Sequence, residues 1–135
     1  MCWAGGEMKG LKAGMQANDE GEVAASNRSF GDLMIKLNEQ PQVVIILVEG
    51  AAIGGGLGLA CVGDVTLVTA DARFRLSETS LGIPPAQLAP FVTERVGRTR
   101  ARRRMLTGAR FKGEEAAALA MAQCVATDTA DMEAP

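Results

Sequence analysis

The chain has 135 residues, with 14 lysines and arginines against 16 aspartates and glutamates and a formal net charge of −2 at pH 7. This length suffices for one domain with a hydrophobic core, and the near-neutral charge gives no general attraction to nucleic acid or to membranes. The sequence contains no histidine and no tyrosine, which excludes Ser-His-Asp and Cys-His triads, histidine metal ligands and histidine general bases. Any catalysis must therefore use carboxylates, lysine, hydroxyls, a thiol or backbone dipoles.

The cysteines and the first residues bear on the cellular compartment. Cys2, Cys61 and Cys124 are far apart and form no CxxC pair, which argues against a disulfide framework and a zinc site and favours a reducing environment. The first residues lack the basic and apolar segments of a signal peptide, and the longest apolar run, residues 43–48, is too short to span a bilayer. We therefore expect a cytoplasmic protein.

The first predicted helix covers residues 23–37 and ends before Pro41. Its apolar residues recur at helical spacing: Phe30, Leu33, Met34 and Leu37. Residues 43–48 are uninterrupted, apolar and largely β-branched. This run predicts a strand buried on both faces, as in a parallel sheet covered by helices.

The rest of the chain alternates between strand and helix patterns around a glycine triplet, residues 54–56. The triplet opens a helix of small residues that ends near Gly63. The further predicted elements are strands at 64–69 and 72–76, a loop at 77–85, helices at 86–96, 99–106 and 113–121, a short strand at 124–126 and a frayed tail at 129–135. This order predicts an α/β fold with parallel strand pairing and one domain.

Two glycine clusters are candidate sites for an anion or an oxyanion. Gly54, Gly55 and Gly56 follow a strand and open a helix, where free N–H groups meet the positive end of the helix dipole. Close packing of the helix on the strand is an equally good explanation. Gly5 and Gly6 form a second cluster, for which an ordinary turn is the simpler interpretation. If their N–H groups converge with those of the triplet, the two clusters make a two-donor oxyanion hole.

Glu78 is the candidate acid–base residue. It lies just past a predicted strand and before an apolar Leu-Gly-Ile-Pro-Pro turn. A carboxyl group in apolar surroundings has a raised pKa and can exchange protons near neutral pH. A surface charge or a helix cap is the competing interpretation.

Six arginines gather in one short stretch: Arg95, Arg98, Arg100, Arg102, Arg103 and Arg104. Nucleic-acid binding is one reading of such a cluster, but Phe91 is the nearest aromatic residue before it and the chain as a whole is slightly acidic. A solvated helix face or a subunit interface with acidic partners fits better, and a phosphate-rich cofactor is a third possibility.

Together the motifs resemble the crotonase, or enoyl-CoA hydratase/isomerase, superfamily. Residues 2–9 are similar to its Phe-x-Ala-Gly-Ala/Gly-Asp-hydrophobic-Lys segment, and residues 49–60 to its Asn-Gly-x-Ala-x-Gly-Gly-Gly-x-Glu-Leu-Ala segment. Residues 72–78 resemble Ala-x-Phe-x-x-Pro-Glu, and residues 103–108 end on the same Leu-Thr-Gly. The resemblance implies a crotonase-like ββα spiral of the α/β class. Residues 78–91 are closest in pattern to the isohexenylglutaconyl-CoA hydratase group of acyclic terpenoid breakdown.

The resemblance also implies roles for individual residues. The N–H groups of Gly6 and Gly55 would hold the thioester oxygen of an acyl-CoA as it becomes an enolate, and Glu78 would exchange the proton. Coenzyme A would enter as part of the substrate, with no separate cofactor and no metal. The further positions assigned to substrate binding are Ala4, Glu7, Met8, Lys9, Gly54, Gly58 and Gln87. A homotrimer or a dimer of trimers would be the assembly at full length, with no nucleic acid or membrane as partner.

Two departures from the family pattern bear on the reaction. The family's hydratases commonly use two glutamates; Glu78 matches the second, but Gly58 stands where the first is expected. We interpret the space above Gly58 as room for a bulky acyl chain. Family members are also about twice as long, so residues 1–128 are expected to be the central part of the core domain, with the fold incomplete at both ends.

The sequence is compatible with three functions. The first is hydration of a branched 2-enoyl-CoA, with Glu78 exchanging the proton. The second is double-bond isomerisation, which needs only one carboxylate and is favoured by Gly58. The third is a non-catalytic fragment or an acyl-CoA-binding or assembly protein.

Overall fold

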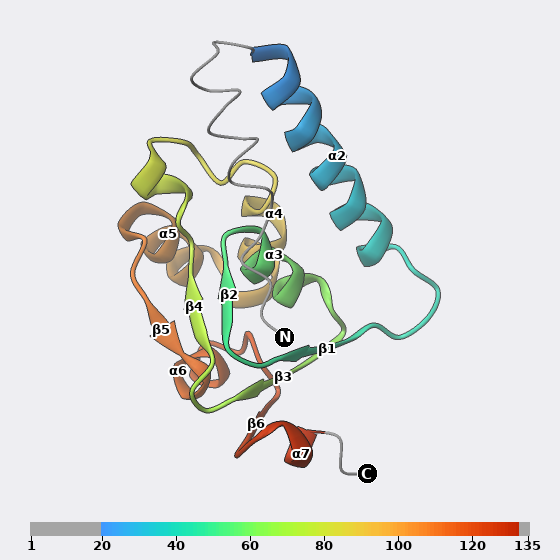
Figure 1. Cartoon of the computed structure of the whole chain (residues 1–135), viewed down its shortest axis with the longest axis vertical. Helices are drawn as coiled ribbons and strands as arrows, with labels where there is room; N and C mark the ends of the chain where they lie inside the picture. Colours follow the sequence, from blue (N-terminus) through green and yellow to red (C-terminus); the bar gives the residue numbers. More distant parts are fainter. Residues whose placement is uncertain (1–19, 133–135) are drawn as a thin grey trace.

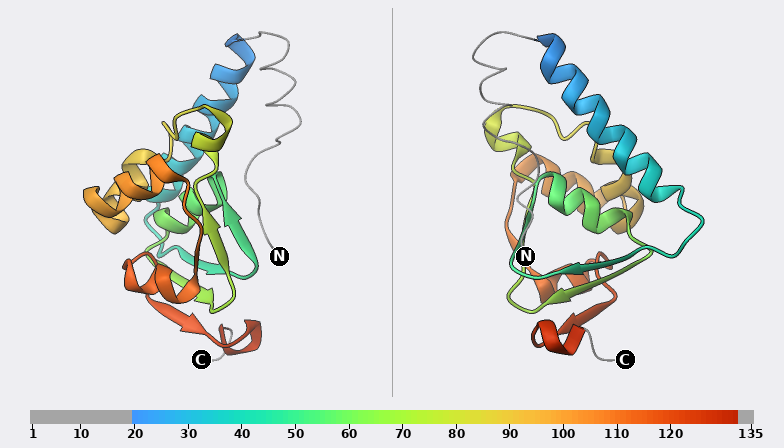
Figure 2. Two further views of the ribbon diagram at one scale, coloured as in Figure 1. Left: turned by 90° about the vertical axis from the view of Figure 1, so that its left-hand side faces the viewer. Right: turned by 45° about the vertical axis from the view of Figure 1, so that its right-hand side comes forward.

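The computed structural model describes residues 20–132, whose strands form two three-stranded sheets (Figure 1). The first has the order β1-β3-β6 and is parallel throughout; the second has the order β2-β4-β5, with β2 parallel to β4 and β5 antiparallel. The strands are β1 (Ile45–Val48), β2 (Ala51–Ile53), β3 (Val65–Thr69), β4 (Arg73–Arg75), β5 (Phe111–Lys112) and β6 (Cys124–Ala126). The two sheets run at a steep angle to each other, as both views of Figure 2 show. The predicted parallel pairing is confirmed.

The helices follow the predicted order closely. They are α2 (Glu20–Asn38), α3 (Gly55–Val62), α4 (Ala89–Val96), α5 (Arg98–Thr107), α6 (Gly113–Ala118) and α7 (Thr129–Met132), with a short 3-10 helix η1 (Glu78–Leu81). Among the described residues, none of these helices is long and apolar enough to cross a membrane. The left-handed glycine Gly108 ends α5 as expected.

Three expectations about the helices need correction. Helix α4 begins at Ala89 instead of position 86, because the Leu88 N–H donates to the Pro85 carbonyl at 3.1 Å in a turn that precedes the helix. Helix α6 ends at Ala118 instead of position 121, because Ala120 adopts a positive φ of 60°. The expected loop at 77–85 contains η1.

Residues 129–132 belong to the tail that the sequence predicts to fray, and in the structure they have a regular conformation. They form α7, and Met132 is buried. The Asp131 carboxylate accepts a hydrogen bond from the Thr127 N–H at 2.9 Å, and the Asp131 N–H donates to the Asp128 carboxylate at 3.0 Å. These local bonds stabilise a short helix that apolar periodicity alone does not reveal.

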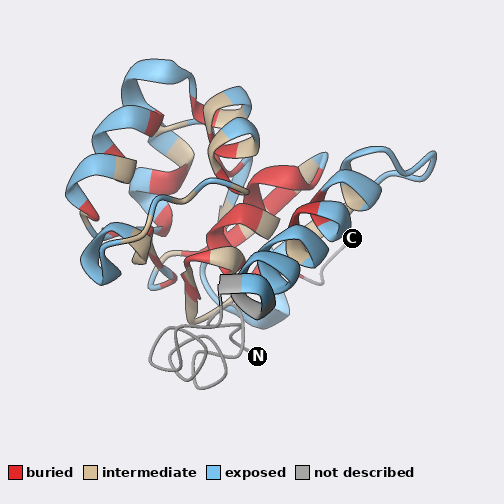
Figure 3. Cartoon of the chain, turned by 90° about the horizontal axis from the view of Figure 1, so that it is seen from above, coloured by how far each residue is buried: buried red, intermediate tan, exposed pale blue. Residues whose placement is uncertain are grey.

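The core surrounds α3, the most deeply buried helix of the described chain (Figure 3). Leu57 and Ala60 of α3 are fully enclosed, and Phe74 of β4 stacks on Phe111 of β5 with ring centroids 5.3 Å apart. Small residues along α3 let the neighbouring helices and β2 approach it closely. The core therefore holds the glycine triplet at a fixed place in the fold.

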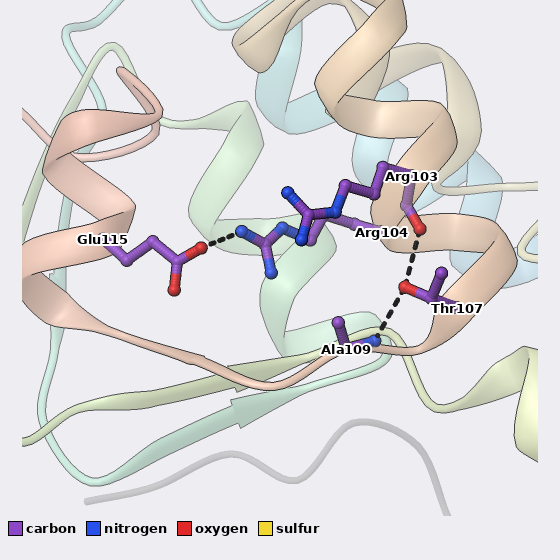
Figure 4. A network of polar contacts seen from close by, with 5 residues as sticks. All are labelled: Arg103, Arg104, Thr107, Ala109 and Glu115. Atoms are coloured by element: carbon purple, nitrogen blue, oxygen red, sulfur yellow. Dashed lines mark hydrogen bonds and ion pairs between the residues drawn. The ribbon is translucent and has the colours of Figure 1, made fainter.

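The arginine cluster is divided between two environments. Arg104 is buried and forms an ion pair with Glu115 (Figure 4), and its guanidinium carbon lies 4.7 Å from the centroid of the Phe111 ring. Arg95 donates to the carbonyl of Cys61 at 3.1 Å, and Arg100 to that of Leu119 at 3.4 Å. The exposed members are Arg98, Arg100, Arg102 and Arg103. Part of the cluster therefore stabilises the fold, and the rest forms the expected solvated helix face.

The strand at 45–48 is buried on one face only, so the expectation of burial on both faces is wrong. Alternate residues Val43, Ile45 and Leu47 are 72%, 60% and 47% exposed, whereas Val48 is buried. Figure 1 shows β1 at the edge of its sheet with α3 above the opposite face. The inner face is covered as predicted, and the outer face presents a row of apolar side chains to solvent.

We expect this outer face to make the 135-residue chain self-associate at micromolar concentration, because exposed apolar patches and parallel-strand edges promote association. Ile45→Lys should shift the chain toward monomer by placing a charge in the middle of the row. Sedimentation velocity on both proteins measures this. A monodisperse wild-type monomer that melts cooperatively would contradict the prediction.

Candidate functional site

The structure brings Glu78 directly against the glycine triplet. Gly54 has a φ of +57°, and a Cβ placed on it would lie 2.8 Å from Oε1 of Glu78 and 3.4 Å from Oγ of Ser77. The carboxylate therefore occupies the space beside the Gly54 backbone that any other residue would fill. Two motifs separated by more than twenty positions in the sequence form one site.

Strand pairing explains this meeting. Strands β2 and β4 are parallel, and Ile53 pairs with Arg75 at their carboxyl ends. The Gly54 N–H donates to the Arg75 carbonyl at 2.8 Å, so the two chains leave the sheet together. Parallel strands deliver the segments that follow them to the same edge of the sheet.

The segment that carries Glu78 is anchored on both sides. The Arg75 guanidinium donates to the Gly108 carbonyl at 3.1 Å and to the Ser80 hydroxyl at 2.6 Å. The Thr79 hydroxyl donates to the Met105 carbonyl of α5. These bonds tie η1 to α5 and fix the position of the carboxylate next to it.

The carboxyl group of Glu78 lies in an environment that favours its neutral form. Burial raises its pKa above the ordinary value of 4.5, and the backbone N–H groups of Glu78 and Ser77 oppose the rise only partly. Its Oε2 atom is buried and accepts no hydrogen bond from any residue between 20 and 132. A buried, unpartnered carboxylate oxygen is costly to fold, and a proton-transfer group ready for a substrate has this character.

The first turn of α3 supplies the hydrogen-bond donors. The Gly54 carbonyl accepts from the N–H groups of Leu57 and Gly58 at 3.0 and 3.1 Å. Gly55 and Gly56, as the first residues of the helix, have N–H groups without intrahelical acceptors. The Gly54 N–H is already engaged by Arg75, so the donors for a ligand are Gly55 and Gly56. The assignment of Gly55 to the oxyanion stays a prediction.

We expect Gly54→Ala to lower activity far more than stability, because its Cβ would displace the Glu78 carboxylate. Gly82→Ala is the matched control: Gly82 has a similar φ of +75°, with nothing within 4 Å of an added Cβ. Gly82 lies in the left-handed region, where alanine costs about 1–2 kcal/mol. Gly54 has a ψ of −119° and lies outside that region, so Gly54→Ala should lose at least as much stability, and turnover is compared at a temperature where both variants are folded. Equal loss of turnover in both would contradict the role of the Gly54–Glu78 contact.

Gly58 is buried against side chains of two other helices. A Cβ placed there would lie 2.5 Å from Cδ2 of Leu88 and 3.3 Å from Cε of Met34. The structure therefore leaves no open space above Gly58 in which an acyl chain could lie. The expectation that this space accommodates a bulky acyl chain is wrong, because Leu88 and Met34 fill it. The binding role of Gly58 itself stays a prediction.

Gln87 directs its side chain at α2. Its Oε1 and Cδ lie where a Cβ of Gly31 would be. This contact fits the simple packing role of a residue near a helix start; orientation of substrate by Gln87 stays a prediction. Of the other candidate positions, Ala4, Gly6, Glu7, Met8 and Lys9 lie outside the described residues.

The sequence did not single out Ser77 or Leu88. Ser77 is the residue before Glu78, and its hydroxyl lies near Gly54; its place next to the acidic residue was the available signal. Leu88 gives no local signal, because its contact with Gly58 joins positions thirty residues apart.

Other nucleophiles and ligands are placed differently. Burial raises the pKa of the Cys61 thiol to about 12, with Arg95 opposing the rise, so this cysteine stays protonated at neutral pH. Within residues 20–132, the acidic and cysteine side chains form no group of three or more that could hold a metal ion.

Comparison with known proteins agrees with the site. Residues 3–133 match the family model described as enoyl-CoA hydratase/isomerase. The chain is 31% identical over 131 residues to "Enoyl-CoA hydratase ACTT6" of Alternaria alternata, covering 96% of this chain and 44% of that protein. It superposes on the structure of "Pseudomonas aeruginosa AtuE" with a TM-score of 0.90 and 48% identity, over 96% of this chain and 50% of that one. It also superposes on the structure of an enoyl-CoA hydratase/isomerase from Marinobacter aquaeolei with a TM-score of 0.85 and 41% identity, again over 96% of this chain and 50% of that one.

The chain thus spans about half the length of the relatives it matches. The expected crotonase-like α/β fold is confirmed, since the structural neighbours are crotonase-fold enoyl-CoA hydratases. With a family match over almost its whole length, the chain belongs to the enoyl-CoA hydratase/isomerase family.

Proposed function

We propose that this chain carries the reacting centre of an enzyme that adds water across the double bond of a branched 2-enoyl-CoA. The observation that carries the proposal is the half-buried carboxylate of Glu78 beside the glycine triplet, whose Oε2 atom has no hydrogen-bond partner among the described residues. Proton donor or acceptor and oxyanion donors thus meet at one point, as an enolate mechanism requires.

In this mechanism the Gly55 N–H, with that of Gly6, donates to the thioester oxygen as negative charge moves onto it. Each such donor is typically worth about 3 kcal/mol in the transition state. The Glu78 carboxylate takes a proton from water as the water oxygen bonds to the β-carbon, and then delivers a proton to the α-carbon. The product is a 3-hydroxyacyl-CoA, and Glu78 returns to its starting state.

The names of several relatives support hydration as the reaction. Among them are the enoyl-CoA hydratase ACTT6 of Alternaria alternata and the mevalonyl-coenzyme A hydratase SIDH of Beauveria bassiana. The second of these names a branched substrate, which suits the branched acyl group proposed here. Residues 4–9 would line the path of the coenzyme A. For the full-length protein we propose a homotrimer or a dimer of trimers in the cytoplasm.

Double-bond isomerisation is the second candidate, because one observation favours it. Isomerisation needs one carboxylate that removes a proton from one carbon and returns it to another. Leu88 and Met34 fill the space beside Gly58, so Glu78 acts without a second carboxylate from that position.

The test incubates the 135-residue chain with branched and straight 2-enoyl-CoA thioesters in D₂O and follows the products by NMR. Hydration gives a 3-hydroxyacyl product with deuterium at the α-carbon, whereas isomerisation moves the double bond and adds no oxygen to the acyl chain. Glu78→Gln should stop either reaction. Neither product, with no binding of acyl-CoA by calorimetry, would favour the non-catalytic fragment.

A further inference from the structure

We propose that Leu88 excludes a second carboxylate from the substrate site and so restricts the site to chemistry by Glu78 alone. The inference rests on the proposed function for its chemical meaning. Its geometric half, exclusion of a side chain at position 58 by Leu88, is independent of activity.

The exclusion starts from the position of Gly58 on α3. It lies one turn after Gly55, on the same helix that supplies the oxyanion donors. A Cβ at this position would meet Leu88 Cδ2 at 2.5 Å, closer than real carbon contacts, while Leu88 Cγ at 3.4 Å lies at ordinary contact distance, so the Leu88 methyl group would have to shift. The Leu88 side chain therefore occupies the volume through which any longer side chain must pass.

Leu88 has little freedom to move aside. Its side chain is buried, with the whole residue 4% exposed, and the fully buried Met34 closes the other side of the contact. Its backbone is held at both ends: its N–H donates to the Pro85 carbonyl at 3.1 Å, and its carbonyl accepts from the Val92 N–H at 3.0 Å. The neighbouring Gln87 is fixed against Gly31 of α2. Displacing Leu88 would thus disturb the packing of three helices, α2, α3 and α4.

The chemistry of this wall opposes a second carboxylate as strongly as its shape. Leu88 and Met34 present methyl groups to position 58, and an ionised carboxylate placed among them would lose its hydration without gaining a donor. Glu78 approaches the glycine triplet from the segment after β4 and touches Gly54. Within the described part of the chain, the site therefore has one carboxylate on one side and an apolar wall one helical turn along α3.

The experiment is a double-mutant cycle on the 135-residue chain, with Gly58→Glu, Leu88→Ala and both together, read by thermal unfolding. We expect Gly58→Glu to lower the melting temperature by about 10 °C, and Leu88→Ala to restore at least half of that loss by opening the volume. The control adds Val68→Ala, which opens a cavity in the buried face of β3, to Gly58→Glu; these two shifts should add. If the melting-temperature shifts of Gly58→Glu and Leu88→Ala also add, the proposal is overturned.

The second readout is the product ratio with a short straight 2-enoyl-CoA. Gly58→Glu with Leu88→Ala should raise hydration relative to double-bond movement at least tenfold, because two carboxylates can then hold the water. If the melting temperatures of Gly58→Glu and Leu88→Ala are coupled but the ratio of hydration to double-bond movement does not change, Leu88 has no role in specificity. If the wild-type chain neither binds nor converts the thioester while the stabilities couple, the proposed function fails and the exclusion by Leu88 stands.

Discussion

Glu78→Gln should lower kcat on the best enoyl-CoA at least about a hundredfold, the usual scale for loss of a positioned acid or base. The glutamine keeps the shape of the side chain and its contact with Gly54 but cannot accept or deliver the proton. Gly58 offers no carboxylate to compensate. Steady-state rates measure the loss, and Glu94→Gln, an exposed carboxylate on α4, should leave the rate unchanged. Near-normal turnover by Glu78→Gln would remove Glu78 from the mechanism.

The same substitution should stabilise the protein at neutral pH. Burial raises the pKa of Glu78 in the folded chain above its ordinary value of 4.5, so the folded state binds this proton more tightly than the unfolded state. Between the two pKa values the folded state keeps a proton that the unfolded state has released, and stability falls as pH rises through that window. Above the folded pKa, a buried charge remains as a constant cost that glutamine does not carry.

Melting temperatures measured across a range of pH test the direction of this pH dependence. Glu78→Gln should melt higher than wild type at pH 7, and the difference should shrink as the pH falls through the raised pKa toward 4.5. A difference that grows in acid would mean that the carboxylate is stabilised by a partner in the folded state, contrary to the unpartnered Oε2. Gain of stability with loss of turnover is typical of a group kept for function.

Local patterns were sufficient to predict the elements with clear periodicity or clear ends. The helix that became α2, the strand β3 and the helix ends at Gly63 and Gly108 were all foreseen, because helical spacing, β-branched runs and glycines at helix ends act over a few residues. Strands β2 and β5 were missed because two or three residues carry no measurable period. Their existence depends on pairing with β4, and the local sequence does not specify that pairing.

The site was foreseen in part for the same reason. Glu78 and the glycine triplet carry their chemistry in their residue types, so the sequence identified each as a candidate. Their meeting depends on the register of β2 against β4, in which Ile53 pairs with Arg75. The packing of Leu88 on Gly58, like the exposure of Ile45, is a property of the tertiary fold. An apolar run shows that burial of its side chains is favoured, but the neighbouring elements decide which face of the strand is buried.

The donor at Gly55 can be removed without breaking its helix. Gly55 is the first residue of α3, the position where proline is best tolerated, because the N–H lost there has no intrahelical acceptor. Gly55→Pro should therefore leave the melting temperature within a few degrees of wild type. It should lower kcat by about 10²–10³-fold, the cost of deleting one oxyanion donor, with a smaller effect on the binding of the thioester.

Gly55→Ala is the control that adds a side chain but keeps the N–H, so it separates crowding from loss of the hydrogen bond. If the N–H is the oxyanion donor, Gly55→Ala retains clearly more activity than Gly55→Pro, and circular dichroism shows both folded. The loss in the proline variant should fall on kcat more than on KM, because the oxyanion forms only as the thioester oxygen gains charge. A folded Gly55→Pro variant with wild-type kcat would show that the oxyanion is stabilised elsewhere, and Gly56, the next free donor of the same turn, would then be the residue to test.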